Sequence, residues 1–265
     1  MDNKTLRQRF NPDGSLLRRQ QLRMLDILRE VDRICRKHHI SYWLSSGTLI
    51  GALRHDGFIP WDDDLDIEMM RSDYLRLMSV LPSELPDWLA LQNDETDPGY
   101  FYFYAKLRDR RSRMLEQNAY DRHWKEQGIY IDIFPMERHP IWLHRLTELT
   151  VGHIYKVWRT STDDHKAIRT VRRIFMLNKK VVFPCLRLLC RLLPGKIITS
   201  GMGIPFHNPR YAHEIFPLTT HRFEDGEFPV PGNSDAHLRH IYGDYMQLPD
   251  LSKLAPHVGK LEFYD

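Results

Sequence analysis

LSSGTLIGALRHDGFIPWDDDLDIEM, from Leu44 to Met69, is the stretch of sequence that decides the fold of this chain. The segment Ile40 to Ser46 overlaps the start of this stretch. Its aromatic and β-branched residues predict a short strand, which Gly47 ends. Thr48 to His55 then has the apolar content of a helix, which stops at Asp56 and Gly57. From Asp62 to Met70, carboxylates alternate with apolar residues, which predicts a second strand. The expected local order is strand, tight turn, helix and strand.

Three carboxylates of the predicted second strand share one face. Side chains alternate along a strand, so Asp64, Asp66 and Glu68 point the same way, with neighbours about 6.6 Å apart along the backbone. Carboxylate oxygens select hard cations such as Mg²⁺ or Mn²⁺. Asp62 and Asp63 add two negative charges, and a cation would relieve the repulsion. The alternative interpretation is an exposed edge strand that these charges keep soluble.

The turn before the predicted helix is a candidate phosphate site. Ser46, Gly47 and Thr48 lie at its start, where unpaired backbone N–H groups bind phosphate oxygens. The alternative is that these residues only cap the helix. A carboxylate strand soon afterwards favours the phosphate interpretation, because phosphoryl transfer needs both an anion cradle and a divalent cation.

The rest of the chain mixes helices and strands, so the predicted class is α+β with a mixed sheet flanked by helices. The further expected elements are helices over Leu16–His38 and Ser72–Leu81, the latter stopping at Pro82, strands over Tyr100–Leu107 and Ile129–Phe134, the latter ending at Pro135, and mostly helix from His139 to Leu193. We divide the chain into a catalytic core with an N-terminal helix (1–138), a basic helical region (139–200) and a C-terminal segment that packs back on the core (201–265), together one compact unit.

Composition limits the functional classes. The chain has 265 residues, of which 42% are hydrophobic, and no apolar run reaches the roughly 18 residues that a membrane-spanning helix needs. The polar N-terminus lacks the apolar segment of a secretory signal, so we expect a cytoplasmic protein. Its three cysteines, Cys35, Cys185 and Cys190, form neither a disulfide framework nor a zinc site.

Positive charge is concentrated in one part of the chain, which we name the basic belt. Residues 165–213 hold ten Lys and Arg and no Asp or Glu, whereas the remaining residues hold 28 basic and 35 acidic side chains. This asymmetry indicates an anionic partner such as membrane lipid, nucleic acid or a phosphorylated glycan. The segment with Lys179, Lys180, Arg187 and Arg191 is our candidate for docking on an anionic membrane surface; the alternatives are a solvated helix face and packing within a helical subdomain.

The run from Leu44 to Met69 resembles the signature of the LicD family, which has a nucleotidyltransferase-type fold and includes phosphocholine transferases and fukutin-type proteins. Later segments are also similar to blocks of that family: YAKLRD (Tyr104–Asp109), IYIDIFPM (Ile129–Met136) and FEDGEFPVPGNSDAHLRHIYGDYMQLP (Phe223–Pro249). The resemblance therefore covers most of the chain.

The resemblance implies an enzyme that transfers a substituted phosphate, such as phosphocholine or a polyol phosphate, from a CDP-linked donor, with release of CMP. The acceptor would be a sugar or lipid-linked glycan of the cell surface, such as lipopolysaccharide or teichoic acid, and no nucleic-acid partner is expected. Carried over by position, Asp64 and Asp66 become ligands of Mg²⁺ or Mn²⁺, and Asp132 becomes the third carboxylate, either a ligand or the general base. Glu68 departs from the family pattern, in which a small residue is common there.

Three cations in or beside these blocks, Arg54, Lys106 and Arg108, are candidates for binding the donor phosphates. Each is equally a candidate partner for the acidic cluster. Two rival functions remain at this point. One is nucleotidyl transfer proper, and the other is a catalytically inert module that binds membranes or polyanions.

Overall fold

The structure is a computed structural model that describes residues 2–116, 121–161, 163–192, 197–206, 208–254 and 258–264. The helices in these ranges are α1 (Asn3–Phe10), α2 (Leu16–Lys37), α3 (Ser46–His55), α4 (Arg71–Glu84), α5 (Ile141–Thr160), α6 (Asp164–Leu177), the π-helical turn η1 (Asn178–Val182), α7 (Phe183–Leu192), α8 (Ala212–Ile215) and α9 (Ser234–Tyr242). The strands are β1 (Trp43–Leu44), β2 (Asp66–Met70), β3 (Leu89–Gln92), β4 (Ala105–Asp109), β5 (Ser112–Glu116), β6 (Tyr130–Arg138), β7 (Ile197–Ser200), β8 (Arg210–Tyr211), β9 (Thr219–Phe223), β10 (Gly226–Val230) and β11 (Val258–Phe263). This mixture confirms the α+β class.

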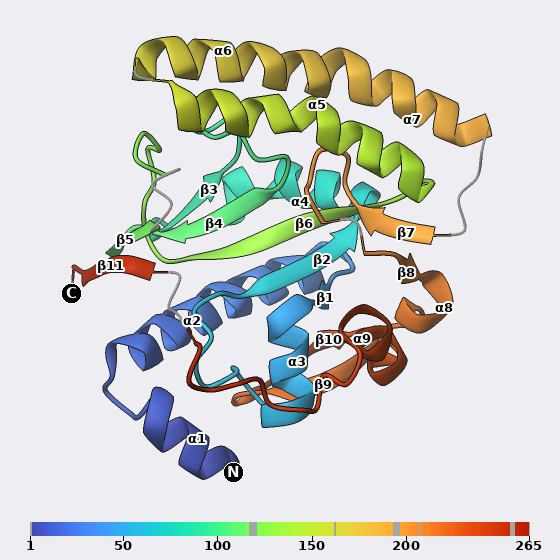
Figure 1. The fold of residues 1–265 in the computed structure, drawn as a ribbon. Helices are drawn as coiled ribbons and strands as arrows, with labels where there is room; N and C mark the ends of the chain where they lie inside the picture. Colours follow the sequence, from blue (N-terminus) through green and yellow to red (C-terminus); the bar gives the residue numbers. More distant parts are fainter. Residues whose placement is uncertain are drawn as a thin grey trace.

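A mixed sheet forms the centre of the molecule. Its strands follow the order β1-β2-β6-β4-β3, and β7 and β8 extend it from the end of β6 (Figure 1). β2 and β6 are parallel, with Asp66 opposite Asp132, while β4 and β6 are antiparallel, with Lys106 opposite Asp132. Cross-strand neighbours share a face of the sheet. The register therefore aligns Asp66, Asp132 and Lys106 across three adjacent strands.

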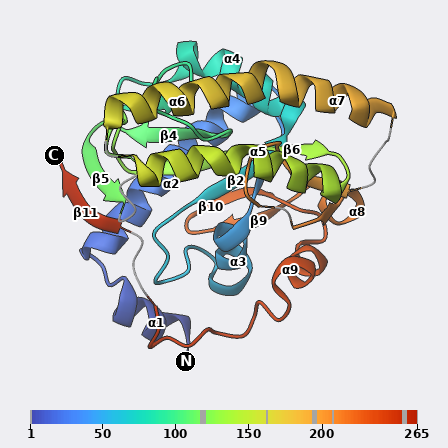
Figure 2. The ribbon, with the colours of Figure 1, turned by 45° about the horizontal axis from the view of Figure 1, so that its top comes forward.

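The opposite face of the sheet is apolar and is covered by α2 and α4. Ile67 and Ile133, which alternate with the aligned polar residues, are fully buried in one core with Leu28 of α2 and Leu77 of α4. α5 and the nearly continuous rod of α6, η1 and α7 form a separate layer, visible at the top of Figure 1 and running antiparallel in Figure 2. That layer packs on a second core around Phe101 and Trp158. The strands that carry Asp66 and Asp132 are therefore packed on their apolar face against α2 and α4.

The beginnings of two predicted strands differ from the expectation. β2 starts at Asp66 rather than at Asp62, because Gln20 and Gln21 of α2 bond the carbonyls of Asp63 (2.7 Å) and Asp62 (2.9 Å) and hold that segment against the helix. β4 starts at Ala105 rather than at Tyr100, and the preceding aromatic residues pack under the helical layer instead.

Two predicted stops at proline are wrong. α4 continues through Pro82 to Glu84, and Leu85 N still donates to Leu81 O (3.0 Å) beyond it. β6 continues through Pro135 to Arg138. β4 pairs with β6 up to Ile133 and β7 from Met136, so the nitrogen of Pro135 lies between the two ladders, where a donor is not needed.

None of the helices in the described ranges is long and apolar enough to cross a membrane.

Candidate active site

The N-terminus of α3 is bonded to the first residue of β2. Ser45 N donates to Asp66 O (3.1 Å), and Asp66 N donates to the hydroxyl of Thr48 (2.9 Å). The side chain of Ser45, the residue before α3, makes no cap hydrogen bond to the first turn. The first N–H groups of a helix have no partner within the helix, and anion binding by those of Ser46, Gly47 and Thr48 stays a prediction.

Gly47 lies against the carboxylates that follow α3. A Cβ atom at this position would lie 2.6 Å from Oδ2 of Asp62 and 4.0 Å from Oδ1 of Asp64. The neighbouring Ser46 has a φ of 50°, which is left-handed and strained for a residue other than glycine. The lack of a side chain at Gly47 thus allows the carboxylates to lie close to the backbone at the start of α3.

Four carboxylates share this part of the molecule. Desolvation raises the pKa of Asp66 well above its usual value, and the negative charges of Asp64 and Asp132 raise it further. Burial and the negative charge of Asp64 raise the pKa of Asp62 as well. The structure therefore brings the predicted Asp64, Asp66 and Asp132 into one electrostatic cluster, to which Asp62 is added.

Lys106 supplies positive charge to this cluster. Its side chain is 1% exposed, and Nζ donates to Oδ1 of Asp132 over 2.7 Å. Nζ also lies 3.4 Å from the centre of the Tyr130 ring, a cation–π contact. Of the three predicted phosphate-binding cations, Lys106 is the one that the structure joins to the carboxylates.

The donor chemistry of the cluster fits a hard divalent cation. All four side chains offer carboxylate oxygens, and their mutual repulsion, expressed in the raised pKa values, is what a bound cation would relieve. Within the described part of the chain, however, no three His, Cys, Asp or Glu side chains already stand in a metal-holding arrangement. Metal ligation by Asp64, Asp66 and Asp132 stays a prediction.

Arg54 and Arg108 donate hydrogen bonds to groups other than the carboxylates, and the negative charge of Asp62 acts on Arg54. Arg54 is in the last turn of α3 and donates to the carbonyl of Tyr245 (2.7 Å). Arg108 is fully buried and donates to the side chain of Gln92 (2.7 Å) and to Gly128 O (2.8 Å). These hydrogen bonds tie chain segments together, and a phosphate role for either arginine stays a prediction.

Glu68 is held by partners away from the cluster. It is 2% exposed, accepts a hydrogen bond from the indole of Trp43 (3.1 Å) and forms an ion pair with Arg210. Each of its two oxygens thus already accepts a hydrogen bond from a partner outside the cluster. These contacts favour a structural role for Glu68 over metal ligation.

We expect Glu68→Gln to lower the free energy of unfolding by about 3 kcal/mol, because it leaves the buried Arg210 without its counter-charge. Turnover per folded molecule should stay close to wild type. Urea unfolding combined with an activity assay at low temperature measures both quantities. A stable variant without activity would instead place Glu68 among the catalytic groups.

Sequence reasoning did not single out Tyr242. Burial raises the pKa of its phenol, and Ser46 and Asp66 are among the groups that act on it. Tyr242 is the last residue of α9, so the C-terminal segment reaches the α3 turn. The block from Phe223 to Pro249 was the only signal for it, and that block does not single out one position.

Comparison with known proteins bears directly on this arrangement. Residues 39–187, which carry the α3 turn and the aligned strands, match the family described as LicD/FKTN/FKRP, nucleotidyltransferase domain. The chain belongs to the LicD/FKTN/FKRP family. This confirms the resemblance of the Leu44–Met69 run and makes the chain a LicD-type phosphotransferase.

Relatives of this LicD-family chain differ in how much of it they match. It is 30% identical over 263 residues to the lipopolysaccharide cholinephosphotransferase LicD of Haemophilus influenzae, covering 91% of this chain and 95% of the relative. Over 64 residues it is 42% and 41% identical to uncharacterized proteins of Rickettsia prowazekii and Rickettsia typhi, which is 24% of this chain in each case and 24% and 21% of those proteins. The Haemophilus protein is thus similar along nearly its full length.

Proposed function

We propose that this LicD-family enzyme transfers phosphocholine from CDP-choline to a sugar hydroxyl of a lipopolysaccharide-type glycan and releases CMP. The observation that carries the proposal is the bonding of the N-terminus of α3, which the Ser45 side chain does not cap, to the strand that bears Asp66, beside Asp132 and Lys106. An anion cradle beside a carboxylate cluster is what phosphoryl transfer requires. The name of the Haemophilus relative supports the choice of phosphocholine and lipopolysaccharide.

Asp64, Asp66 and Asp132 are the residues that would hold Mg²⁺ or Mn²⁺. When bound, the cation would supply positive charge to the diphosphate and to the departing CMP. The backbone N–H groups of Ser46, Gly47 and Thr48 bind and orient phosphate oxygens. Transfer forms a bond from the sugar oxygen to the phosphorus of phosphocholine and breaks the bond from that phosphorus to the CMP oxygen, and the hydroxyl proton leaves to a base.

The test is CMP release from CDP-choline with purified protein, Mg²⁺ and a lipopolysaccharide acceptor, compared with CDP-linked polyols and with teichoic acid as acceptor. We expect CMP and an acceptor that gains phosphocholine. An acceptor that gains CMP would show nucleotidyl transfer instead, and the absence of any product with intact donor binding would favour an inert binding module. Loss of turnover on adding a chelator, with recovery on adding Mg²⁺, would establish the metal.

The outer helical layer carries a surface that suits an anionic membrane, but not with all the residues first expected. Lys179 is paired with Asp94 (2.7 Å) and Arg187 with Glu137 (2.6 Å), so the charges of both are compensated within the protein. Lys180 and Arg191 are exposed. Beside them are exposed apolar side chains of the same rod: Leu177, Val181, Leu188 and Leu189.

We propose that this face rests on the cytoplasmic side of a membrane. Replacing Lys180 and Arg191 by Glu should weaken binding to vesicles with anionic lipid by at least about 30-fold, since each basic residue near such a surface contributes about 1 kcal/mol. The matched control is Lys4→Glu with Arg9→Glu, which reverses two exposed charges on α1. Vesicle sedimentation at physiological salt measures both, and equal losses in the two variants would contradict a specific docking face.

A further inference from the structure

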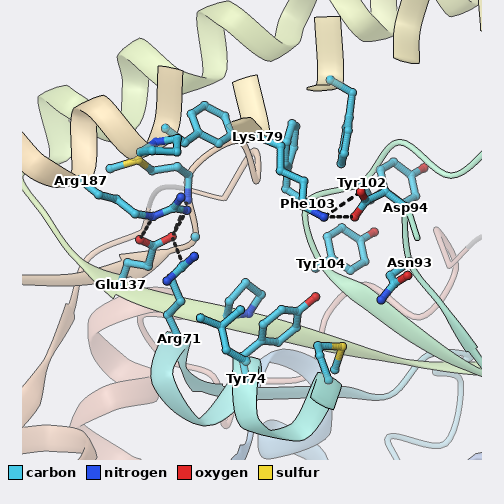
Figure 3. A pocket seen from close by; sticks show the side chains of 18 of the residues that line it. Arg71, Tyr74, Asn93, Asp94, Tyr102, Phe103, Tyr104, Glu137, Lys179 and Arg187 are labelled. Carbon is cyan, nitrogen blue, oxygen red and sulfur yellow. Dashed lines mark hydrogen bonds and ion pairs between the residues drawn. The ribbon is translucent and has the colours of Figure 1, made fainter. Parts of the chain in front are cut away.

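A cavity lies where the central sheet is interrupted. On one edge of β6, β4 pairs up to Ile133 and β7 from Met136, and between them Gly201 N donates to Pro135 O (2.7 Å). The cavity, of about 260 Å³, opens beside this point between α4 and the rod of η1 and α7 (Figure 3).

Aromatic rings supply much of its lining. Tyr102 and Tyr104 are stacked with ring centres 5.1 Å apart, and Phe103 is stacked on Phe175 at 4.2 Å. Tyr74 of α4 lines the same space (Figure 3). Rings fixed by such packing offer flat apolar surfaces whose position is already set before a ligand binds.

Charged side chains line the same cavity, and they compensate each other. Arg187 donates to both oxygens of Glu137 (2.6 and 2.8 Å), and Arg71 lies 3.9 Å from that carboxylate. On the other side, Lys179 donates to both oxygens of Asp94 (2.8 and 2.7 Å). An ionic ligand would have to displace one of these partners, whereas a neutral ligand with several hydroxyls meets fixed donors and acceptors.

The cavity shares a wall with the carboxylate cluster. The ring of Tyr104 packs against Phe134 at 4.5 Å and lies 5.6 Å from Nζ of Lys106, which bonds Asp132. The cavity is smaller than the roughly 300–1,000 Å³ of pockets for drug-sized ligands, so it suits a single ring rather than a nucleotide-linked donor.

We propose that this cavity binds the sugar ring that accepts the transferred group. The inference rests on the proposed function, since it assigns the acceptor to a pocket beside the catalytic cluster. The apolar faces of the sugar ring contact the aromatic walls of the cavity, and the sugar hydroxyls form hydrogen bonds with the paired ionic side chains.

Leu75→Trp tests the proposal, because Leu75 lines the cavity but is 47% exposed, so a larger side chain at the rim blocks the space without entering the core. Leu75→Met is the matched control of similar volume. We expect Leu75→Trp to raise the KM for the glycan acceptor by at least about tenfold while slow hydrolysis of the CDP-linked donor in the absence of acceptor is unchanged. Tyr74→Phe, which removes one hydroxyl, should raise the same KM by a smaller factor. An unchanged acceptor KM in Leu75→Trp would overturn the proposal.

A binding measurement separates this proposal from the proposed function. Saturation-transfer NMR with methyl β-galactoside and methyl β-glucoside should show contact with wild type and with Leu75→Met, and loss of contact with Leu75→Trp. This result would support the cavity assignment even if no CDP-linked compound were turned over. If Leu75→Trp instead abolished binding of choline and left the glycosides bound, the cavity would belong to the transferred group and the acceptor assignment would be wrong.

Discussion

Replacing Asp66 with Asn is expected to lower phosphotransfer by several orders of magnitude. Asp66 starts β2, lies opposite Asp132 and is bonded through its backbone to the α3 turn, so its carboxylate stands where phosphate binding and metal ligation are predicted to meet. A group that acts on charge growing in the transition state affects turnover more than substrate affinity. CMP release with Mg²⁺ measures the loss, and turnover comparable to wild type would remove Asp66 from the site.

The same variant should fold at least as stably as wild type. Burial and the charges of neighbouring carboxylates raise the pKa of Asp66 in the folded protein, so stability is lost as the pH rises from the ordinary carboxyl pKa through the folded-state pKa, and Asn removes this loss. We therefore expect an unchanged or higher melting temperature without metal, and a smaller gain on adding Mg²⁺. Asp63→Asn is the control, because it removes one negative charge from the same segment at a position that the predicted alternation places on the opposite face from Asp64 and Asp66. An equally inactive Asp63→Asn would show that both carboxylates serve the reaction.

The sequence predicted much of the local structure around this site, because that structure depends on patterns of short range. The alternation around Leu65 and Ile67 determines which side chains enter the core, and the glycine after two serines marks the turn at α3. The helix over Leu16–His38 also follows from its own apolar periodicity, and the structure confirms it as α2.

Features that depend on contacts between distant segments were not predictable in this way. Glu68 shares the face of Asp66, yet Arg210, 142 residues further along the chain, neutralises it. Lys179 and Arg187 belong to a run of positive charge that is typical of a solvent-exposed surface, but they form ion pairs with Asp94 and Glu137. The interruption of the sheet at Pro135 likewise depends on where β7 returns, and a local pattern does not contain that information.

Asp132→Asn is the second substitution for which we expect a large loss, because the two roles open to this carboxylate both serve the reaction. If Asp132 accepts the proton of the sugar hydroxyl, its loss should lower turnover by about 10²- to 10⁴-fold. Asn retains an oxygen that can accept the hydrogen bond from Lys106 (2.7 Å in the wild type), and Asp66 remains in electrostatic contact with both groups. The variant should therefore fold, whereas Lys106→Met, which leaves the carboxylates without their cation, should lose about 3 kcal/mol of unfolding free energy.

Titration with Mg²⁺ distinguishes the two roles of Asp132. A ligand contributes to cation affinity, so its loss should raise the Mg²⁺ concentration needed for half-maximal turnover, and excess Mg²⁺ should restore part of the activity. A general base instead contributes to the acidic limb of the pH profile of kcat, so that limb should disappear while the Mg²⁺ dependence stays as in wild type. Wild-type turnover in Asp132→Asn would contradict both roles, and the contact with Lys106 would then make Asp132 a structural partner of that buried cation.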